Sequence, residues 1–222
     1  MVESFQQLAG TPFANGVNAL CWPRWLPGDF HEVAARLHVV PGINALDESV
    51  LEKLQVGANG QTAIAVMLED LRQLRGLDLS PELNCIEGSV REEQDGALPT
   101  DVYSFHADSA TVEADTWLCT YLGATSEGLR NDEALRHMDI PETRAKLLHE
   151  YGGEDDEGFL EYLNENFYDL HYQPLPNARP FSFGIGKLWR VALEHPGCPV
   201  PPCIHRAPIT LPGEARRLLL IS

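Results

Sequence analysis

Two side chains that can bind a metal ion stand two residues apart in the tripeptide His106-Ala107-Asp108. The residues before it, 102–105, are rich in types that favour strands. In an extended chain, residues i and i+2 project from the same face, so the imidazole and the carboxylate can reach one ion. A hydrogen-bonded surface pair would give the same tripeptide, and a third ligand is therefore needed to predict a metal site.

A third candidate ligand, His205, lies far along the chain, before a predicted turn at 211–213 and a predicted strand that opens with Arg216 and Arg217. Neighbouring residues of a strand point to opposite faces, so only one of the two arginines can face the ligands. A planar guanidinium can bind a carboxylate through two hydrogen bonds. The pattern therefore predicts an anion site beside the metal.

Two imidazoles and one carboxylate form a facial triad around Fe(II), which leaves coordination positions open for a chelating 2-oxo acid and for dioxygen. The residues predicted to bind the metal are His106, Asp108 and His205. His171, in a strand-like run at 169–173, would replace His205 if the strands are counted differently.

From Tyr103 to the C-terminus, the order of these residues resembles that of the Fe(II)- and 2-oxoglutarate-dependent oxygenases. The resemblance implies that the triad binds Fe(II) and that Arg216 or Arg217 binds the far carboxylate of 2-oxoglutarate. It also implies an oxidoreductase, a dioxygenase that hydroxylates a small molecule or a peptide. Tyr103 and Tyr121 are further candidates for binding the co-substrate, although a core aromatic ring with a satisfied hydroxyl is the alternative for both.

A second resemblance is to a bacterial family described only as a domain of unknown function. Its motifs correspond here to Phe105-His-Ala-Asp108, Leu118-Cys-Thr-Tyr121 with Gly123, His205-Arg-Ala-Pro208 and Arg217-Leu-Leu-Leu220, and more weakly to Asn18-Ala-Leu-Cys-Trp-Pro-Arg24. Ala207 stands where the family has serine. This likeness supports the paired motifs and names no substrate.

Two other readings compete with an iron site. His195, Cys198, Cys203 and His205 could form a structural zinc site, although a paired Cys-x-x-Cys is missing. Alternatively, the protein is a non-enzymatic jelly-roll binding module in which His106 and Asp108 are structural.

The elements expected to position these residues are helical first and then mainly strands. Apolar periodicity predicts helices at 29–38, 47–55 and 60–77, so that residues 1–80 are mostly helical. Between 100 and 222, strands are predicted at 101–106, 112–122, 169–173, 181–193 and 216–222, with helices at 141–151 and 155–166 inside an insertion at 131–166. The predicted fold is α+β: a double-stranded β-helix, or jelly-roll barrel, with N-terminal packing helices and a helical insertion over one mouth.

Composition limits the class of protein. The 222 residues fit one domain, and five scattered cysteines suit a reducing cytoplasm. A formal charge of −17 argues against nucleic acid and anionic membranes as partners. Such a charge could attract a cationic substrate, although its more common effect is to keep a protein soluble. The N-terminal residues lack the pattern of a secretory signal, so a cytoplasmic protein is expected.

Overall fold

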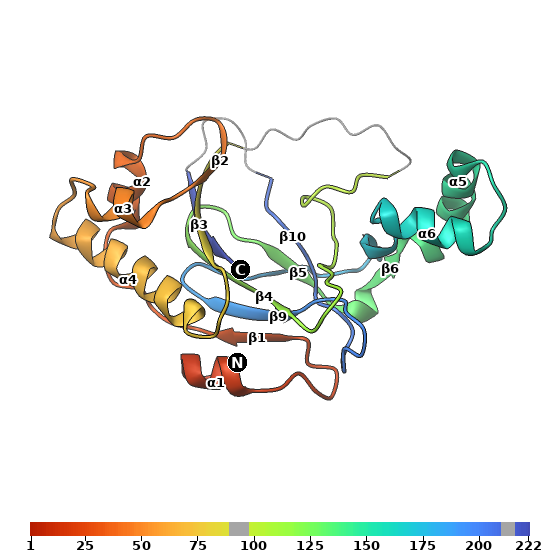
Figure 1. The fold of residues 1–222 in the computed structure, drawn as a ribbon, viewed down its shortest axis with the longest axis horizontal. Coiled ribbons are helices and arrows are strands. Elements are labelled where there is room, and N and C mark those ends of the chain that lie inside the picture. The colour runs from red at the N-terminus through yellow and green to blue at the C-terminus, as the bar shows by residue number, and fades with distance from the viewer. Residues whose placement is uncertain (89–97, 210–215) are drawn as a thin grey trace.

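The computed structural model describes residues 1–88, 98–209 and 216–222, with strands in the centre and helices at both ends (Figure 1). The strands are β1 (Ala19–Trp22), β2 (Gly42–Ala45), β3 (Glu82–Glu87), β4 (Asp115–Leu122), β5 (Glu127–Leu129), β6 (Ala134–Arg136), β7 (Tyr172–Pro174), β8 (Phe181–Ser182), β9 (Leu188–Ala192), β10 (Ile204–Arg206) and β11 (Arg217–Ile221). The helices are α1 (Phe5–Gly10), α2 (Phe30–Arg36), α3 (Glu48–Glu52), α4 (Ala58–Arg75), α5 (Pro141–Tyr151) and α6 (Glu157–Glu165), with short 3-10 helices η1 (Asn131–Glu133), η2 (His137–Asp139) and η3 (Tyr168–Leu170).

The described strands form antiparallel sheets. A six-stranded sheet has the order β1-β9-β4-β11-β3-β2, a three-stranded sheet has the order β10-β5-β8, and β6 pairs with β7. The prediction of an α+β fold is confirmed. The predicted closed barrel is wrong for the described strands, because the large sheet ends at β1 on one side and at β2 on the other.

The N-terminal part is less helical than predicted. The helices at 29–38, 47–55 and 60–77 are present as α2, α3 and α4, but β1 and β2 also lie in this part and form the two edges of the large sheet. Each of these strands has only four residues. They are held by pairing with β9 and β3, which are distant in sequence, and local periodicity therefore gives no sign of them.

One face of the large sheet packs against the N-terminal helices. Buried residues of α4, such as Met67 and Leu71, share a core with Trp117, Cys119 and Tyr121 of β4. Alternate residues of a strand point to opposite faces. The other face of β4 and β11 is therefore left for the three-stranded sheet and for the space between the two sheets.

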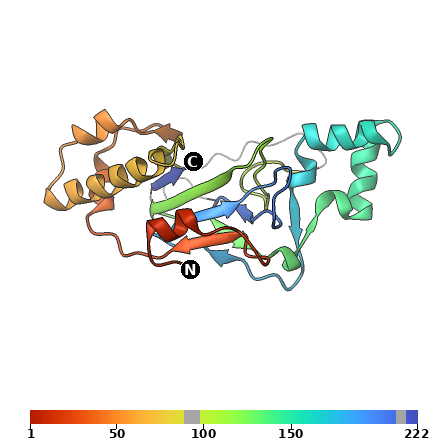
Figure 2. The same ribbon diagram turned by 60° about the horizontal axis from the view of Figure 1, so that its bottom comes forward.

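The helical insertion lies at the other end of the molecule and has its own small core (Figures 1 and 2). Leu147, Phe159, Leu163 and Tyr168 are buried together there. Helix α5 begins with Pro141, where a missing N–H costs nothing, and ends at Gly152 in the left-handed conformation. Both helices predicted for the insertion are confirmed.

The predicted strand at 101–106 is wrong. The Asp101 carboxylate accepts hydrogen bonds from the backbone N–H groups of Tyr103 and Ser104, which makes a local turn. Within 101–106, only His106 forms β-bridges, and these pair it with His171 and His205. The strand predicted at 181–193 is divided into β8 and β9. In the part of the chain that the structure describes, no helix combines the length and apolarity needed to cross a membrane.

Candidate metal centre

Backbone pairing brings the two histidines of the predicted triad together. The N–H of His106 donates to the carbonyl of His205 at 2.9 Å, and the N–H of His205 donates to the carbonyl of His106 at 2.9 Å. Residues that exchange both hydrogen bonds in this way place their side chains on the same face of the ladder. The two imidazole centroids are accordingly 4.7 Å apart.

Asp108 completes the cluster from the His106 segment. Its Oδ1 lies 3.7 Å from the Nε2 of His106, and its Oδ2 lies 3.7 Å from the Nε2 of His205. Potential ligand atoms of the three residues all lie within 4.8 Å of one another. The three predicted ligands therefore form a set that can hold a metal ion.

The hydrogen bonds around the triad orient its ligand atoms. The Nδ1 atoms of His106 and His205 lie 2.8 and 3.2 Å from the carbonyl oxygens of Ser104 and Cys203. Because a carbonyl oxygen can only accept, each Nδ1 carries the proton and each Nε2 keeps its lone pair for a metal. The hydroxyl of Thr116 donates to Asp108 at 2.5 Å and fixes the carboxylate from the side of β4.

Burial also keeps His106 ready to bind a cation. Desolvation, with a smaller contribution in the same direction from the neighbouring His205, lowers the pKa of His106 to about 4. A neutral imidazole is the form that coordinates a metal. The site is therefore prepared for a cation at neutral pH.

We expect the metal-free protein to lose stability between pH 6.5 and 4. The unfolded chain protonates His106 near pH 6.5, whereas the folded chain resists protonation until about pH 4. Folding stability is therefore complete above pH 6.5 and falls by up to about 3 kcal/mol as the pH approaches 4. Urea denaturation with a chelator present measures this, and His106→Asn should flatten the curve in that window. An equally steep curve for the variant would contradict the assignment.

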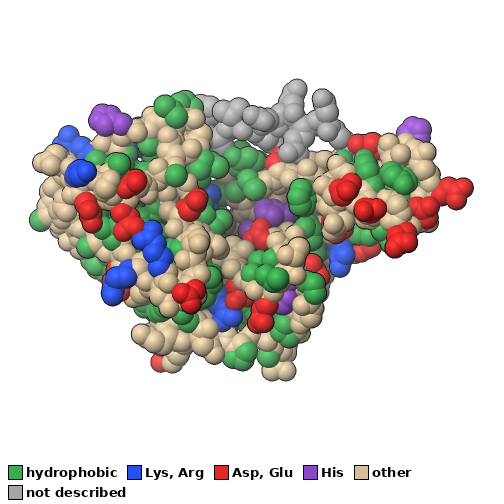
Figure 3. Space-filling view, viewed as in Figure 1, with side chains coloured by type: hydrophobic (Ala, Val, Ile, Leu, Met, Phe, Trp, Pro, Cys, Tyr) green, Lys and Arg blue, Asp and Glu red, His purple; other side chains and the backbone are tan. Residues whose placement is uncertain are grey.

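A pocket of about 220 Å³ opens beside the triad and is lined by His106, Asp108 and His205. Its other walls come mainly from the inner face of the large sheet, including Leu118, Leu219 and Ile221, and are mostly apolar. In the space-filling view, histidine and acidic side chains appear together in a hollow at the middle of one face (Figure 3).

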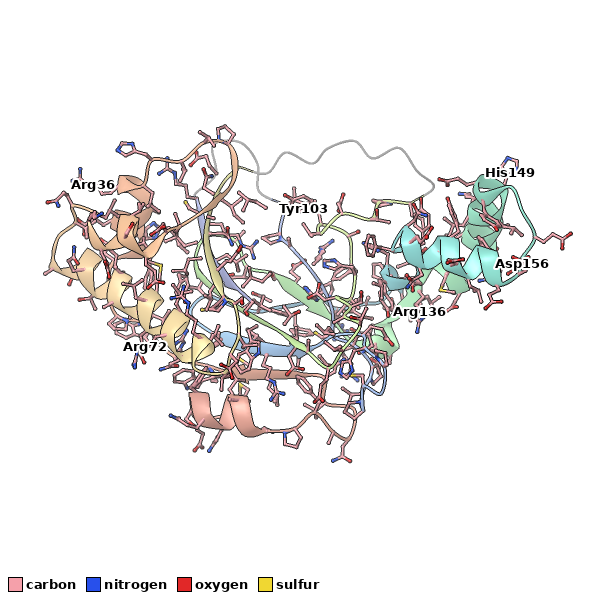
Figure 4. All side chains as sticks on the ribbon, viewed as in Figure 1. Arg36, Arg72, Tyr103, Arg136, His149 and Asp156 are labelled. Carbon is pink, nitrogen blue, oxygen red and sulfur yellow. The ribbon has the colours of Figure 1, made fainter. Side chains whose placement is uncertain are left out.

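Arg217 is the predicted arginine that faces this pocket. Arg217 is 3% exposed. Its Nη2 donates to the hydroxyl of Ser126 at 2.9 Å, whereas its Nε has no hydrogen-bond partner among the described residues. Burial lowers the pKa of Arg217 to about 10. No described carboxylate forms an ion pair with it. Tyr103, which is labelled in Figure 4, also lines the pocket.

Two other predicted residues lie elsewhere. Arg216 points to the opposite side of β11, where its Nη1 donates to the carbonyls of Ala34 and Leu37 and its Nε donates to Glu87. It therefore does not face the pocket.

Tyr121 lies on the helix side of the large sheet. Its hydroxyl donates to Asp70 at 2.7 Å, and its ring stacks on Phe30 at 5.5 Å. Arg24 donates to both oxygens of Asp70, at 2.6 and 2.5 Å, so Arg24, Asp70 and Tyr121 form one buried network. The Leu118–Tyr121 motif and the more weakly matched Arg24 are thus joined by a structural contact on the other face of the sheet.

Sequence reasoning missed two residues that support the site, Thr116 and Ser126. Thr116 lies on the predicted strand at 112–122, and its face alternates with that of Trp117 and Tyr121. The sequence shows that Thr116 lies on the face of the strand opposite to Trp117 and Tyr121, but it does not show which of the two faces turns toward the metal. Ser126 lies just before β5 and carries no sequence signal.

The zinc alternative is not supported by the described residues. Cys203 is buried among Leu118, Phe183 and Val191, and desolvation raises its thiol pKa to about 12. The metal-ligand cluster found among the described residues contains neither Cys198 nor Cys203. His171 pairs with the backbone of His106 but is not one of the three clustered ligands. The predicted turn at 211–213 lies outside the described residues.

The site therefore combines two imidazoles, one carboxylate and a buried guanidinium, a set suited to a divalent metal next to an anionic ligand. Comparisons of the chain with protein-family models, with curated proteins and with solved structures find no match.

Proposed function

We propose that the protein is an Fe(II)- and 2-oxoglutarate-dependent oxygenase that hydroxylates a small molecule or a peptide. The observation that carries the proposal is the position of Arg217, a buried cation without a described carboxylate partner, in the same pocket as His106, Asp108 and His205. A buried charge is costly unless an opposite charge compensates it. A dicarboxylate such as 2-oxoglutarate would compensate the charge of Arg217 with one end and chelate the metal with the other.

The donor set favours iron over a closed zinc site. Two imidazoles and one carboxylate leave several coordination positions free on a metal that accepts six ligands, as oxygen chemistry requires. Cis ligands of such a metal stand roughly 3 Å apart when each bond is about 2.1 Å. The 3.7 Å separations between Asp108 and the two histidines are slightly wider, and small side-chain movements would close them.

The chain path supports a jelly roll as the finer description of the fold. From β3 onward the chain passes back and forth between the two sheets: β3, β4, β9 and β11 belong to the large sheet, whereas β5, β8 and β10 belong to the small one, and β5 and β8 follow one another without a strand of the large sheet between them. The His106 segment, between β3 and β4, pairs with β10 and so extends the small sheet. Such alternation is what two Greek keys folded into a sandwich produce.

With both groups bound, Fe(II) and 2-oxoglutarate would supply the oxidation of a C–H bond by dioxygen, giving succinate and carbon dioxide. The protein would contribute position and surroundings. Thr116 fixes the carboxylate of Asp108, backbone carbonyls fix the two imidazoles, and Ser126 holds the guanidinium of Arg217. The apolar sheet residues around them limit the water in the pocket.

Anaerobic addition of Fe(II) and then 2-oxoglutarate to the metal-free protein tests this proposal. We expect a weak visible charge-transfer band in the wild-type protein and none in His106→Ala or His205→Ala, which each lose a ligand. His149→Ala, on the exposed surface of α5 (Figure 4), is the matched control and should keep the band. Failure to take up Fe(II) would contradict the proposal and favour a binding module, whereas a band that survives both ligand substitutions would contradict the assignment of the ligands.

A further inference from the structure

A second cavity reaches the metal centre. It has a volume of about 580 Å³, and His106 and Asp108 line it as well as the pocket that contains Arg217. The two cavities therefore meet at the metal ligands. If 2-oxoglutarate occupies the Arg217 pocket, the second cavity is the space in which another molecule can approach the same ion.

The two cavities differ in charge. The smaller one contains Arg217, whereas no Lys or Arg is among the described residues that line the larger one. Asp101 and Asp115 line the larger cavity; Asp101 accepts backbone hydrogen bonds, and Asp115 pairs with Arg190 at 2.6 Å. With no cation among its described lining residues and a formal charge of −17 on the chain, this cavity is less favourable to an anion than the Arg217 pocket is.

His171 offers a hydrogen-bond acceptor in the wall of this cavity. Its side chain is 4% exposed, and its Nδ1 lies 2.8 Å from the carbonyl oxygen of Phe167, so Nδ1 carries the proton. Its Nε2 is buried and has no partner among the described residues. An unpaired buried acceptor is costly, and a donor from a bound molecule would remove that cost.

Phe167 marks the same cavity by its conformation. It lies between α6 and η3 with φ +60°, in the left-handed region, which aromatic residues seldom adopt. Its ring is 56% exposed although it lines a cavity, and its carbonyl is the group that fixes His171. Strained backbone of this kind gathers at ligand sites, and an exposed aromatic face also attracts ammonium groups.

We propose that this second cavity is the substrate site and that its ligand is an amine, whose ammonium donates to Nε2 of His171 while an apolar chain lies along Leu170 and Leu193. The inference that the bound amine is the molecule that becomes oxidised rests on the proposed function. The inference that the cavity binds an amine does not. The aliphatic walls suit the chain, and the free acceptor of His171 and the aromatic ring of Phe167 suit the charged end.

Titration calorimetry with two simple probes of equal length, hexylammonium and hexanoate, tests this inference. The anaerobic protein is supplied with Fe(II) and saturating 2-oxoglutarate, so that Arg217 is not free to take the hexanoate. We expect hexylammonium to bind at least about tenfold more tightly than hexanoate, because a hydrogen bond from a charged donor contributes that much. His171→Asn keeps a donor for the Phe167 carbonyl, removes Nε2 and should weaken hexylammonium binding about tenfold, whereas His149→Asn should not.

Equal or tighter binding of hexanoate would overturn the amine assignment, and hexylammonium affinity unchanged in His171→Asn would overturn the site. Absence of hexylammonium binding would also overturn it. The comparison of the two probes on the wild-type protein decides the charge preference even if the variant fails to fold. A preparation that takes up no Fe(II) but binds hexylammonium through His171 would refute the oxygenase and leave the amine site standing.

Discussion

Replacing Arg217 with methionine is expected to raise the 2-oxoglutarate concentration needed for half-maximal succinate formation by about 30-fold to a thousandfold or more. Removing one partner of a buried, hydrogen-bonded charge pair typically costs about 2–5 kcal/mol, which corresponds to this range. Arg217 is 3% exposed, and its fixed contact is the hydroxyl of Ser126, so the variant leaves the far carboxylate of the co-substrate buried without a partner. Steady-state kinetics over a range of 2-oxoglutarate concentrations measures the change.

Arg216→Met is the matched control, because it removes the same kind of side chain from the adjacent residue. Arg216 binds Glu87 and the carbonyls near the end of α2, away from the pocket, so its loss should alter stability and leave the dependence on 2-oxoglutarate within about threefold. If both variants raise the co-substrate requirement equally, or if Arg217→Met changes nothing, Arg217 is not the carboxylate-binding residue.

Asp70→Asn should strongly destabilise the protein, by about 3–5 kcal/mol of unfolding free energy. Asp70 is 1% exposed and accepts from both Arg24 and Tyr121. The amide carries no charge and presents one acceptor oxygen in place of two, so the guanidinium of Arg24 stays buried without its counter-ion. Chemical denaturation followed by circular dichroism gives the free energy.

The double variant Arg24→Met with Asp70→Leu should recover most of this loss, because apolar side chains can replace a buried ion pair at little net cost. Asp155→Asn breaks an exposed ion pair with Arg144 on the helical insertion and should leave the denaturation midpoint nearly unchanged. If Asp70→Asn is no worse than Asp155→Asn, the buried network does not stabilise the fold as inferred.

The sequence predicted the helices α2 to α6 because each carries its own periodic apolar stripe, but not the six-residue helix α1. Helix α5 begins at its proline and ends at its glycine, both of which can be read locally. The edge strands β1 and β2 were missed because four residues contain no usable period, and their stability comes from partners far along the chain. At Asp101 a side chain that caps a turn outweighs the strand preference of the residues after it.

For the site, the sequence predicted the three ligands from short motifs, and the structure brings them together. The sequence did not decide which of Arg216 and Arg217 faces the pocket, because the alternation of side chains along a strand shows only that the two point to opposite faces. The register of β11 in the sheet decides which one faces the pocket. Tyr121 was grouped correctly with Trp117 and Cys119, but that face turns toward α4. The sequence shows which residues of a strand share a face, but only the packing of the sheets decides which face turns toward the ligand.

The glycine at the end of β4 constrains how this site can change. Gly123 has φ +87°, and a Cβ added to it would lie 2.7 Å from the carbonyl oxygen of Arg216 and 3.0 Å from the Cα of Arg217. A side chain there would push β11 away and displace the guanidinium from the pocket. By contrast, the helical insertion at 131–166 packs in a small core of its own, and residues added to its loops would cost little, because the entropy of closing a loop rises only with the logarithm of its length. The anion site is therefore the part of the molecule that tolerates a change of backbone least, whereas the insertion is free to change in length.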